Sequence, residues 1–248
     1  MKIRRLPAAA GLVLALIALA AAPASAGDGP TPHIVGGIPV TTAPSWAAAV
    51  GSSGADMFCS GSLVDKQWVI TAAHCDGAKI IRIGSANLAS GGTLATVAKW
   101  VRHPQYNGNG HDFSLYKLSQ PVANAPITIA AGSPATGAKP TLYGFGQTCT
   151  TEGCGPMSSV LRSVGTTVAA DATCGGIEGN VELCFDTSTT ATDCYGDSGG
   201  PAVVDGMLVG VDSRGADGPG SDTCGRTHSI YGDATTVTTW IKQTIAAG

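Results

Sequence analysis

Residues 194–201 read Cys194-Tyr195-Gly196-Asp197-Ser198-Gly199-Gly200-Pro201 and place a serine between glycines, directly behind an aspartate. Glycine allows a tight turn without Cβ clashes and lets backbone N–H groups come close to a bound molecule. A serine hydroxyl becomes a nucleophile when a base takes its proton and nearby donors stabilise the resulting oxyanion. Gly, Asp and Ser are also ordinary turn residues, so this stretch alone also fits a surface turn.

Two upstream residues supply the partners that such a serine needs. His74 follows the apolar run Trp68-Val69-Ile70, which is typical of a buried strand. An imidazole group can accept a proton from a serine hydroxyl at neutral pH. Asp112 precedes a stretch that alternates apolar and polar residues, and its carboxylate can orient the histidine. Singly, these two are more often a core histidine and a capping or surface aspartate, but the order His, Asp, Ser is a known triad order.

Further motifs stand in order along the chain. They are Ile34-Val35-Gly36-Gly37, Cys59-Ser60-Gly61-Ser62-Leu63-Val64, residues 71–75, 112–118, Tyr143-Gly144-Phe145-Gly146, 194–201, Ser213-Arg214-Gly215, Ser229-Ile230-Tyr231 and Thr239-Trp240-Ile241-Lys242. Together they cover nearly all of residues 34–248 and resemble the trypsin/chymotrypsin-like serine proteases, the S1 family, in a bacterial-type arrangement. The resemblance implies an all-β fold of two antiparallel six-stranded β-barrels with a C-terminal α-helix, with barrels at about 34–132 and 133–248.

The residue pattern is itself typical of an all-β fold. Short apolar runs recur with Gly- and Pro-containing turns between them, as in sandwiches and barrels. The expected strands are 60–64, 68–72, 79–84, 94–101, 113–118, 141–143, 164–169, 201–204, 207–211 and 229–231. Residues 131–140 are a candidate linker between the halves. Residues 235–245 place apolar side chains at helical spacing, which predicts a terminal helix.

The chain opens with features of an export signal. Lys2, Arg4 and Arg5 precede an uncharged apolar run at residues 8–22, and Ala24-Ser25-Ala26 is a small-residue cleavage site. A membrane anchor is the alternative, but the run is short for a span. We therefore expect a signal peptide at residues 1–26 and a secreted, extracellular protein with no membrane association.

Residues 27–33 are polar and rich in Gly and Pro, and they resemble a short activation propeptide. By the logic of the family, cleavage before Ile34 frees an α-ammonium group that pairs with Asp197 and shapes the oxyanion hole. The resemblance assigns that hole to the backbone N–H groups of Gly196 and Ser198. His33 stands where many relatives have Arg or Lys, so a separate activating protease is an expected partner.

All eight cysteines lie after the expected signal, and an even number in an exported chain favours disulfides. Proximity and the family resemblance suggest Cys59–Cys75, Cys174–Cys184 and Cys194–Cys224. Cys149 and Cys154 share one loop and can pair locally. The alternative is a mixed Cys and His zinc site, but no Cys-x-x-Cys pair is present.

The resemblance places the pocket for the substrate side chain around eight residues. These are Thr192, Asp193, Tyr195, Asp212, Ser213, Arg214, Gly215 and Ser229. Ser213 is also expected to donate a hydrogen bond to Asp112. Trypsins carry an aspartate two residues before the cysteine that Cys194 matches, and this chain has Thr192 there. Asp212, Arg214 and Ser229 replace an apolar residue, a tryptophan and a glycine of relatives.

Two interpretations of this altered pocket stay open. Asp193 and Asp212 can form an acidic pocket that selects Lys or Arg, because a buried carboxylate needs a cation. Alternatively, they face solvent or pair with Arg214. The choice decides which peptide bonds the chain would cut.

The remaining features exclude several classes of function. The net charge of −3 and the lack of a basic run argue against nucleic-acid binding. Residues 85–92 hold no acidic residue, so the calcium loop of some relatives is missing, and we expect no cofactor and no metal.

The sequence thus predicts a monomeric serine endopeptidase whose partners are protein or peptide substrates and protein protease inhibitors. An inactive protease-like binding protein is the main alternative, although such proteins usually replace a triad residue and this chain keeps all three. An esterase is a weaker alternative, because residues 194–201 differ from a nucleophile elbow.

Overall fold

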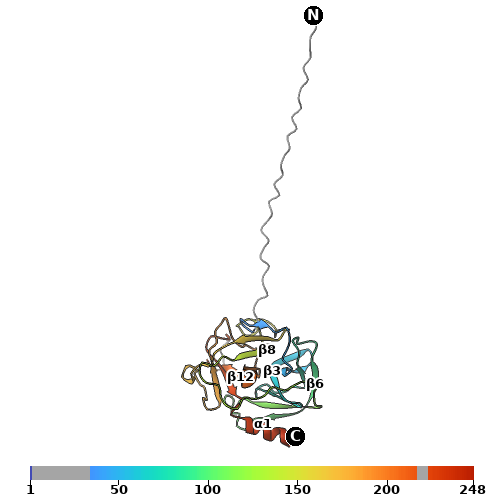
Figure 1. Cartoon of the computed structure of the whole chain (residues 1–248), viewed down its shortest axis with the longest axis vertical. Coiled ribbons are helices and arrows are strands. Elements are labelled where there is room, and N and C mark those ends of the chain that lie inside the picture. Colours follow the sequence, from blue (N-terminus) through green and yellow to red (C-terminus); the bar gives the residue numbers. More distant parts are fainter. Residues whose placement is uncertain (2–33, 217–222) are drawn as a thin grey trace. The chain divides into compact units, whose positions relative to one another are not determined.

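The regular secondary structure of the described chain is mainly β-strand (Figure 1). The structure is a computed structural model that describes Met1, residues 34–216 and residues 223–248. Its elements are β1 (Ile38–Pro39), β2 (Ala47–Ser53), β3 (Asp56–Asp65), β4 (Trp68–Thr71), β5 (Ile80–Ile83), β6 (Thr93–Arg102), β7 (Ser114–Leu118), β8 (Thr141–Gly144), β9 (Arg162–Gly165), the short 3-10 helix η1 (Asp171–Thr173), β10 (Glu182–Phe185), β11 (Pro201–Val204), β12 (Met207–Gly215), β13 (Ser229–Asp233) and α1 (Thr238–Ala247). Apart from Met1, the expected signal and propeptide lie outside the described residues.

The first half of this region is a closed antiparallel barrel in the order β2-β3-β4-β7-β6-β5. Side chains from all six strands fill its interior, among them Val50, Leu63, Val69, Ile81 and Tyr116. The register pairs Thr71 at the end of β4 with Ser114 at the start of β7. His74 follows β4 and Asp112 precedes β7, so this pairing brings the two residues to the same edge of the barrel.

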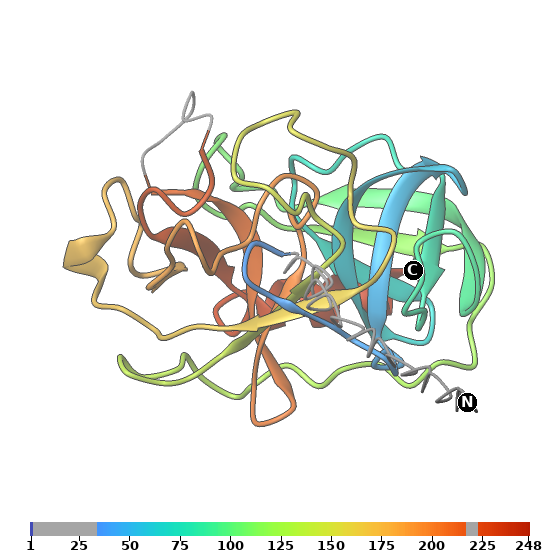
Figure 2. The same cartoon turned by 90° about the horizontal axis from the view of Figure 1, so that it is seen from above.

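The second half is a seven-stranded sheet in the order β1-β9-β8-β11-β12-β13-β10. β1 belongs to this sheet through its pairing with β9, although it precedes the barrel in the sequence. Figure 2 shows the blue-to-green barrel strands and the orange-to-red strands side by side. The predicted all-β fold with one C-terminal helix is confirmed. The second half was expected as a six-stranded barrel and is a seven-stranded sheet, because β1 joins it by pairing with β9.

One apolar cluster joins the two halves and the helix. Trp68 and Leu115 come from the barrel, Leu208 and Val211 from β12, and Ile241 from α1. All five side chains are at least 97% buried. Burying one large aliphatic side chain contributes about 1.5–3 kcal/mol, so this cluster fixes the position of the two halves relative to each other.

Strand prediction failed where residues lack strand character. β2 was not expected because its sequence, Ala-Ala-Ala-Val-Gly-Ser-Ser, is poor in branched and aromatic residues. β10 was missed because Glu182 interrupts a short apolar run. The strand expected at 164–169 lies instead at Arg162–Gly165. Pairing with strands that are distant in the sequence sets these three strands, and a short window of sequence does not contain their partners.

The structure contains four disulfides, and no cysteine in the described chain is free. The pairs are the four that the sequence analysis suggested, Cys59–Cys75, Cys149–Cys154, Cys174–Cys184 and Cys194–Cys224. Two of them, Cys59–Cys75 and Cys194–Cys224, hold the segments that carry His74 and Ser198. Disulfides persist in oxidising compartments, so this pattern fits an extracellular protein.

A buried histidine supports the helix and predicts how stability depends on pH. His103 is 5% exposed, and its ring packs against those of His111 and Trp240, with centroids 4.9 and 4.7 Å away. Its Nδ1 accepts a hydrogen bond from the Gln105 backbone N–H, which requires the unprotonated atom. Burial first, and the neighbouring His111 second, lower the pKa of His103 to about 4.

We therefore expect the contribution of His103 to the stability of the fold to decrease as the pH falls from 6.5 towards 4. In that window the unfolded chain binds a proton at His103 that the folded chain excludes. Thermal unfolding at several pH values is the measurement. His103→Gln should flatten the pH dependence between 6.5 and 4, whereas His228→Gln, at a half-exposed site, should leave the slope as it is. An unchanged slope in His103→Gln would contradict the assignment.

Candidate active site

His74 and Asp112 contact each other at two points in the site. The His74 Nδ1 atom lies 2.7 Å from Asp112 Oδ2, and the His74 backbone N–H donates to Asp112 Oδ1 at 3.0 Å. The Ser213 hydroxyl donates to Asp112 Oδ2 at 2.7 Å, as expected from the sequence. Asp112 is 3% exposed, whereas the His74 side chain is 36% exposed. The carboxylate therefore sits behind the imidazole and holds it, while the ring's other side remains accessible.

β3 supports the loop that carries Ser198. The Ser60 backbone N–H donates to the Ser198 carbonyl at 2.9 Å, and the Ser60 hydroxyl donates to the Gly196 carbonyl at 3.0 Å. Gly199 has a φ of +79°, and a side chain there would collide with Thr71 and with the Ser60 carbonyl. The barrel thus positions a loop that belongs to the other half. Sequence reasoning did not identify Ser60 in this role.

Ser198 and His74 line one cavity of about 670 Å³. The Gly196 φ of +95° turns the chain just before the serine, a backbone conformation that favours glycine. Among the described residues, the backbone N–H groups of Gly196 and Ser198 have no acceptor. They are therefore available to a bound group, whereas the Asp197 N–H between them donates to the Cys194 carbonyl.

Asp197 is a buried carboxyl group beneath this loop. Its side chain accepts hydrogen bonds from the backbone N–H groups of Gly146 at 2.7 Å and Cys194 at 2.9 Å. Burial raises the pKa of Asp197 to about 7, against the effect of these two donors. No Lys, Arg or His of the described chain lies within ion-pair distance of it. Ile34, its expected partner, is 1% exposed, and Val35 bridges Thr192.

The predicted pocket residues line the cavity that holds His74 and Ser198. They are Thr192, Asp193, Tyr195, Asp212, Ser213, Arg214, Gly215 and Ser229. Asp193 and Asp212 are 8% and 4% exposed, so neither faces bulk solvent. Ser229 donates a hydrogen bond to Asp193 Oδ1 at 2.6 Å, and the two carboxyl groups lie within hydrogen-bonding reach of each other.

Burial dominates the electrostatics of this carboxyl pair. It raises the pKa of Asp193, and the Ser229 hydrogen bond only partly offsets the effect. Burial and the neighbouring charge of Asp193 raise the pKa of Asp212 well above its usual range. Two carboxyl groups that share one site cannot both ionise readily, because like charges disfavour each other's ionised form.

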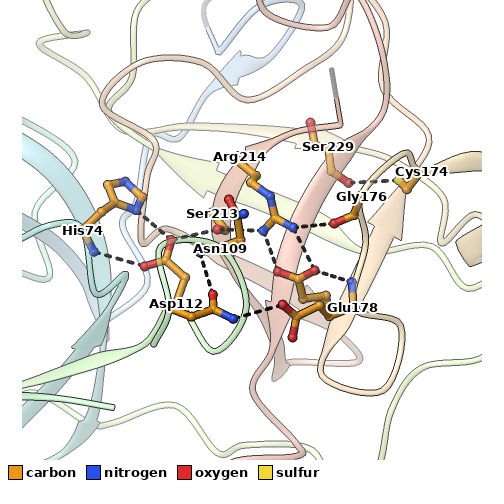
Figure 3. Close-up of polar contacts among 11 residues, drawn as sticks. His74, Asn109, Asp112, Cys174, Gly176, Glu178, Ser213, Arg214 and Ser229 are labelled. Atoms are coloured by element: carbon orange, nitrogen blue, oxygen red, sulfur yellow. Dashed lines mark hydrogen bonds and ion pairs between the residues drawn. The ribbon is translucent and has the colours of Figure 1, made fainter. Parts of the chain in front are cut away.

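Arg214 does not pair with either aspartate, which corrects one of the two pocket interpretations. Its guanidinium forms a two-pronged ion pair with Glu182, at 2.5 and 2.9 Å, and donates to the Gly176 carbonyl at 3.1 Å. The Glu182 side chain is fully buried. Figure 3 shows the resulting chain of contacts from His74 through Asp112 and Ser213 to Arg214.

Sequence reasoning missed Glu182 and several cavity residues. In the sequence, Glu182 stands between the apolar residues Val181 and Leu183. This pattern indicates a buried carboxylate, and a buried charge requires a partner. The cavity also includes Phe58, Asn109 and Thr227, which come from loops and a strand end that no motif marked.

The zinc alternative is not supported by the donor chemistry. Sulfur atoms of Cys59 and Cys75 lie within 4.8 Å of a nitrogen of His74. The two sulfurs are joined in a disulfide, and zinc binds cysteine as a thiolate. This cluster therefore does not offer the ligand set that the alternative needs.

Comparison with known proteins decides the family. The family model described as Trypsin matches residues 34–241, most of the chain. The chain belongs to the trypsin family of serine proteases. Serine protease 1 of Canis lupus familiaris is 35% identical over 206 residues, 77% of this chain and 81% of the relative. Trypsin of Sus scrofa is 34% identical, covering 77% of this chain and 86% of the relative.

A similar solved structure supports the same family. The chain is similar to neuropsin, titled a serine protease expressed in the limbic system of mouse brain, with a TM-score of 0.73 and 30% identity. The match covers 83% of this chain and 99% of that one. Membership of the trypsin family makes this chain a serine-type endopeptidase. No helix of its described residues is long and apolar enough to cross a bilayer.

Proposed function

We propose that this trypsin-family enzyme is secreted and hydrolyses peptide bonds through Ser198, His74 and Asp112. The observation that carries the assignment is the 2.7 Å contact between His74 Nδ1 and Asp112 Oδ2, with His74 and Ser198 lining one cavity. A carboxylate that contacts Nδ1 holds the ring proton on that atom. The unprotonated Nε2 is then the acceptor for a serine proton. The expected leader and the four disulfides support secretion.

The proposed reaction runs in two halves. His74 takes the Ser198 proton as the oxygen attacks the peptide carbonyl, then gives it to the leaving amine, which leaves an acyl-enzyme. Water, deprotonated by His74, then releases the acid and restores the serine. The backbone N–H groups of Gly196 and Ser198 donate to the oxyanion in both halves. Asp112 keeps its negative charge and stabilises the imidazolium.

We further propose that the chain is made as a zymogen cleaved before Ile34. Asp197 is buried and accepts two backbone hydrogen bonds, yet has no cation among the described residues. A new α-ammonium at Ile34 would supply that cation. Because Gly196 and Ser198 flank Asp197, an ion pair at this carboxylate would hold the two oxyanion donors in place.

Covalent labelling tests the proposed nucleophile. We expect diisopropyl fluorophosphate to label the processed chain once, at Ser198, and not to label Ser198→Ala. Peptide mapping of the adduct and circular dichroism of both chains are the measurements, with Ser133→Ala, a serine away from the cavity, as the matched control. Labelling that persists in folded Ser198→Ala would remove the serine from its role. An unlabelled processed chain would instead favour an inactive, protease-like binding protein.

A further inference from the structure

Arg214 is a cavity residue to which the proposed reaction gives no role. It lines the same cavity as His74 and Ser198. Its guanidinium is bound to the carboxylate of Glu182, which is not among the residues that line the cavity. Glu182 lies on β10, and β13 separates that strand from β12, which carries Arg214. Arg214 therefore reaches across a strand to an acid outside the cavity.

The Glu182 carboxylate is held by two donors. Its Oε2 atom accepts a hydrogen bond from the Glu178 backbone N–H at 2.7 Å, and its two oxygens accept from Arg214 at 2.5 and 2.9 Å. None of the Glu182 side chain is exposed, and 18% of the Arg214 side chain is. Separating such a pair would leave a buried charge without a partner, so Glu182 holds the guanidinium in one position.

The terminal nitrogens of the Arg214 guanidinium carry two hydrogens each, and each of the four has an acceptor. Nη1 donates to Glu182 Oε1 and, at 3.4 Å, to the Ser213 hydroxyl oxygen. Nη2 donates to Glu182 Oε2 and, at 3.1 Å, to the Gly176 carbonyl. The planar group fixes the directions of these hydrogens. Because Glu182 and Gly176 take three of them, the fourth is directed at Ser213 (Figure 3).

This contact gives the Ser213 hydroxyl a defined direction. A hydroxyl has one proton and two lone pairs, and the proton rotates to suit its surroundings. Here the oxygen accepts from Arg214, and the proton is donated to Asp112 Oδ2 at 2.7 Å. The same Asp112 oxygen lies 2.7 Å from His74 Nδ1. A cation at the hydroxyl oxygen also polarises the O–H group, which strengthens its hydrogen bond to the carboxylate.

We propose that Arg214 and Glu182 are positioning residues that act on the triad through the Ser213 hydroxyl. The hydroxyl holds the Asp112 carboxylate in the rotation that contacts His74. The inference rests on the proposed function, since it assigns residues that support the same triad. It concerns this chain in particular, because the family resemblance places a tryptophan at position 214, and tryptophan offers one donor and no charge.

The main test removes both charges together, so that neither is left buried without a partner. In Arg214→Met/Glu182→Gln we expect the second-order rate constant for labelling of Ser198 by diisopropyl fluorophosphate to fall about 3- to 10-fold, the effect of one hydrogen bond. The reagent brings no peptide side chain, so its rate reports the triad rather than contacts of a substrate with residue 214.

The matched control removes one charge of each sign outside the cavity. It is Arg102→Met/Asp205→Asn, with one change on β6 and the other in the turn between β11 and β12. This variant should label at the wild-type rate. Thermal unfolding of each chain shows that the compared rates belong to folded protein.

A second background separates positioning from packing. In Ser213→Ala the hydroxyl through which the pair acts is missing, so adding Arg214→Met/Glu182→Gln should lower the labelling rate by less than a further twofold. A pair that only packs the strands would cause the same fractional loss with and without the hydroxyl, because independent effects add in free energy. An unchanged rate in the double variant, or an equal loss in both backgrounds, would overturn the proposal.

Arg214→Lys keeps the proposal testable if the double variant does not fold. The ammonium keeps a charge beside Glu182, but it has three hydrogens for four acceptors. The longest of the four contacts, to Ser213, is the one we expect to be lost. Labelling should then slow at least threefold, and a wild-type rate in folded Arg214→Lys would contradict the positioning role.

A readout without catalysis distinguishes this inference from the proposed function. In chain labelled with ¹⁵N-histidine, NMR follows exchange of the His74 Nδ1 proton with water. We expect exchange at least threefold faster in Arg214→Met/Glu182→Gln than in the wild type, because the carboxylate that holds this proton is less fixed. Equal exchange would refute the positioning role. A wild-type chain that shows this difference but is never labelled would fail the proposed function alone.

Discussion

Replacing Asp112 with Asn should lower kcat about 10⁴-fold while leaving the fold intact, the size that this change has in the His-Asp-Ser triad of this family. Asp112 accepts three hydrogen bonds, from the His74 backbone, the His74 ring and Ser213. An asparagine presents an N–H group in place of one oxygen. The amide would then donate to His74 Nδ1 and shift the ring proton to Nε2, where it blocks transfer from Ser198.

The pH dependence separates this effect from a general loss of structure. Part of the Asp112→Asn activity should return at high pH, where hydroxide can replace the missing base, whereas a disordered site would not recover. Ser213→Ala is the matched control: it removes one donor to the same oxygen but leaves the His74 contact, so the loss in kcat should be far smaller. Thermal unfolding of all three chains completes the measurement. A loss of less than 10-fold in Asp112→Asn would argue against the orienting role.

Two residues of the triad, His74 and Ser198, could be predicted from the sequence because each lies in a local motif. His74 and Ser198 stand in short patterns whose residues have separate chemical reasons to be there, and Asp112 lies where β7 begins. The register of β4 and β7 then brings His74 and Asp112 together. Neither strand shows alternating burial, because β4 is buried throughout and β7 at four of its five residues, so the sequence does not display this register.

The contents of the pocket were harder to predict because they depend on pairing between distant segments. Glu182 lies on β10, which was not expected, and it takes the charge of Arg214. Because Arg214 is bound to Glu182, its guanidinium does not pair with Asp193 or Asp212. The sequence did not reveal this contact and therefore left both interpretations of the pocket open. Ser60 was missed for the same reason, since its role depends on which loop packs against β3.

Asp197→Asn should lower kcat of the processed enzyme by about 10²–10³-fold, the effect of losing one oxyanion donor. Asp197 accepts hydrogen bonds from Gly146 and Cys194 and is flanked by the proposed donors, Gly196 and Ser198. Without its carboxylate, the Ile34 α-ammonium would be buried and unpaired, which costs about 3–5 kcal/mol of stability. Kinetics and urea unfolding are the measurements, with Asp205→Asn as the control that changes charge alone.

In the unprocessed chain, Asp197→Asn should have the opposite effect on stability. There Asp197 has no cationic partner among the described residues, and burial raises its pKa to about 7. At Asp197 the folded chain then binds a proton that the unfolded chain has lost, so the contribution of this residue to stability falls as the pH rises from about 4 to 7. Asp197→Asn should remove that fall and stabilise the unprocessed chain at pH 8, while destabilising the processed one. The same sign in both forms would show that cleavage before Ile34 does not deliver its ammonium to Asp197.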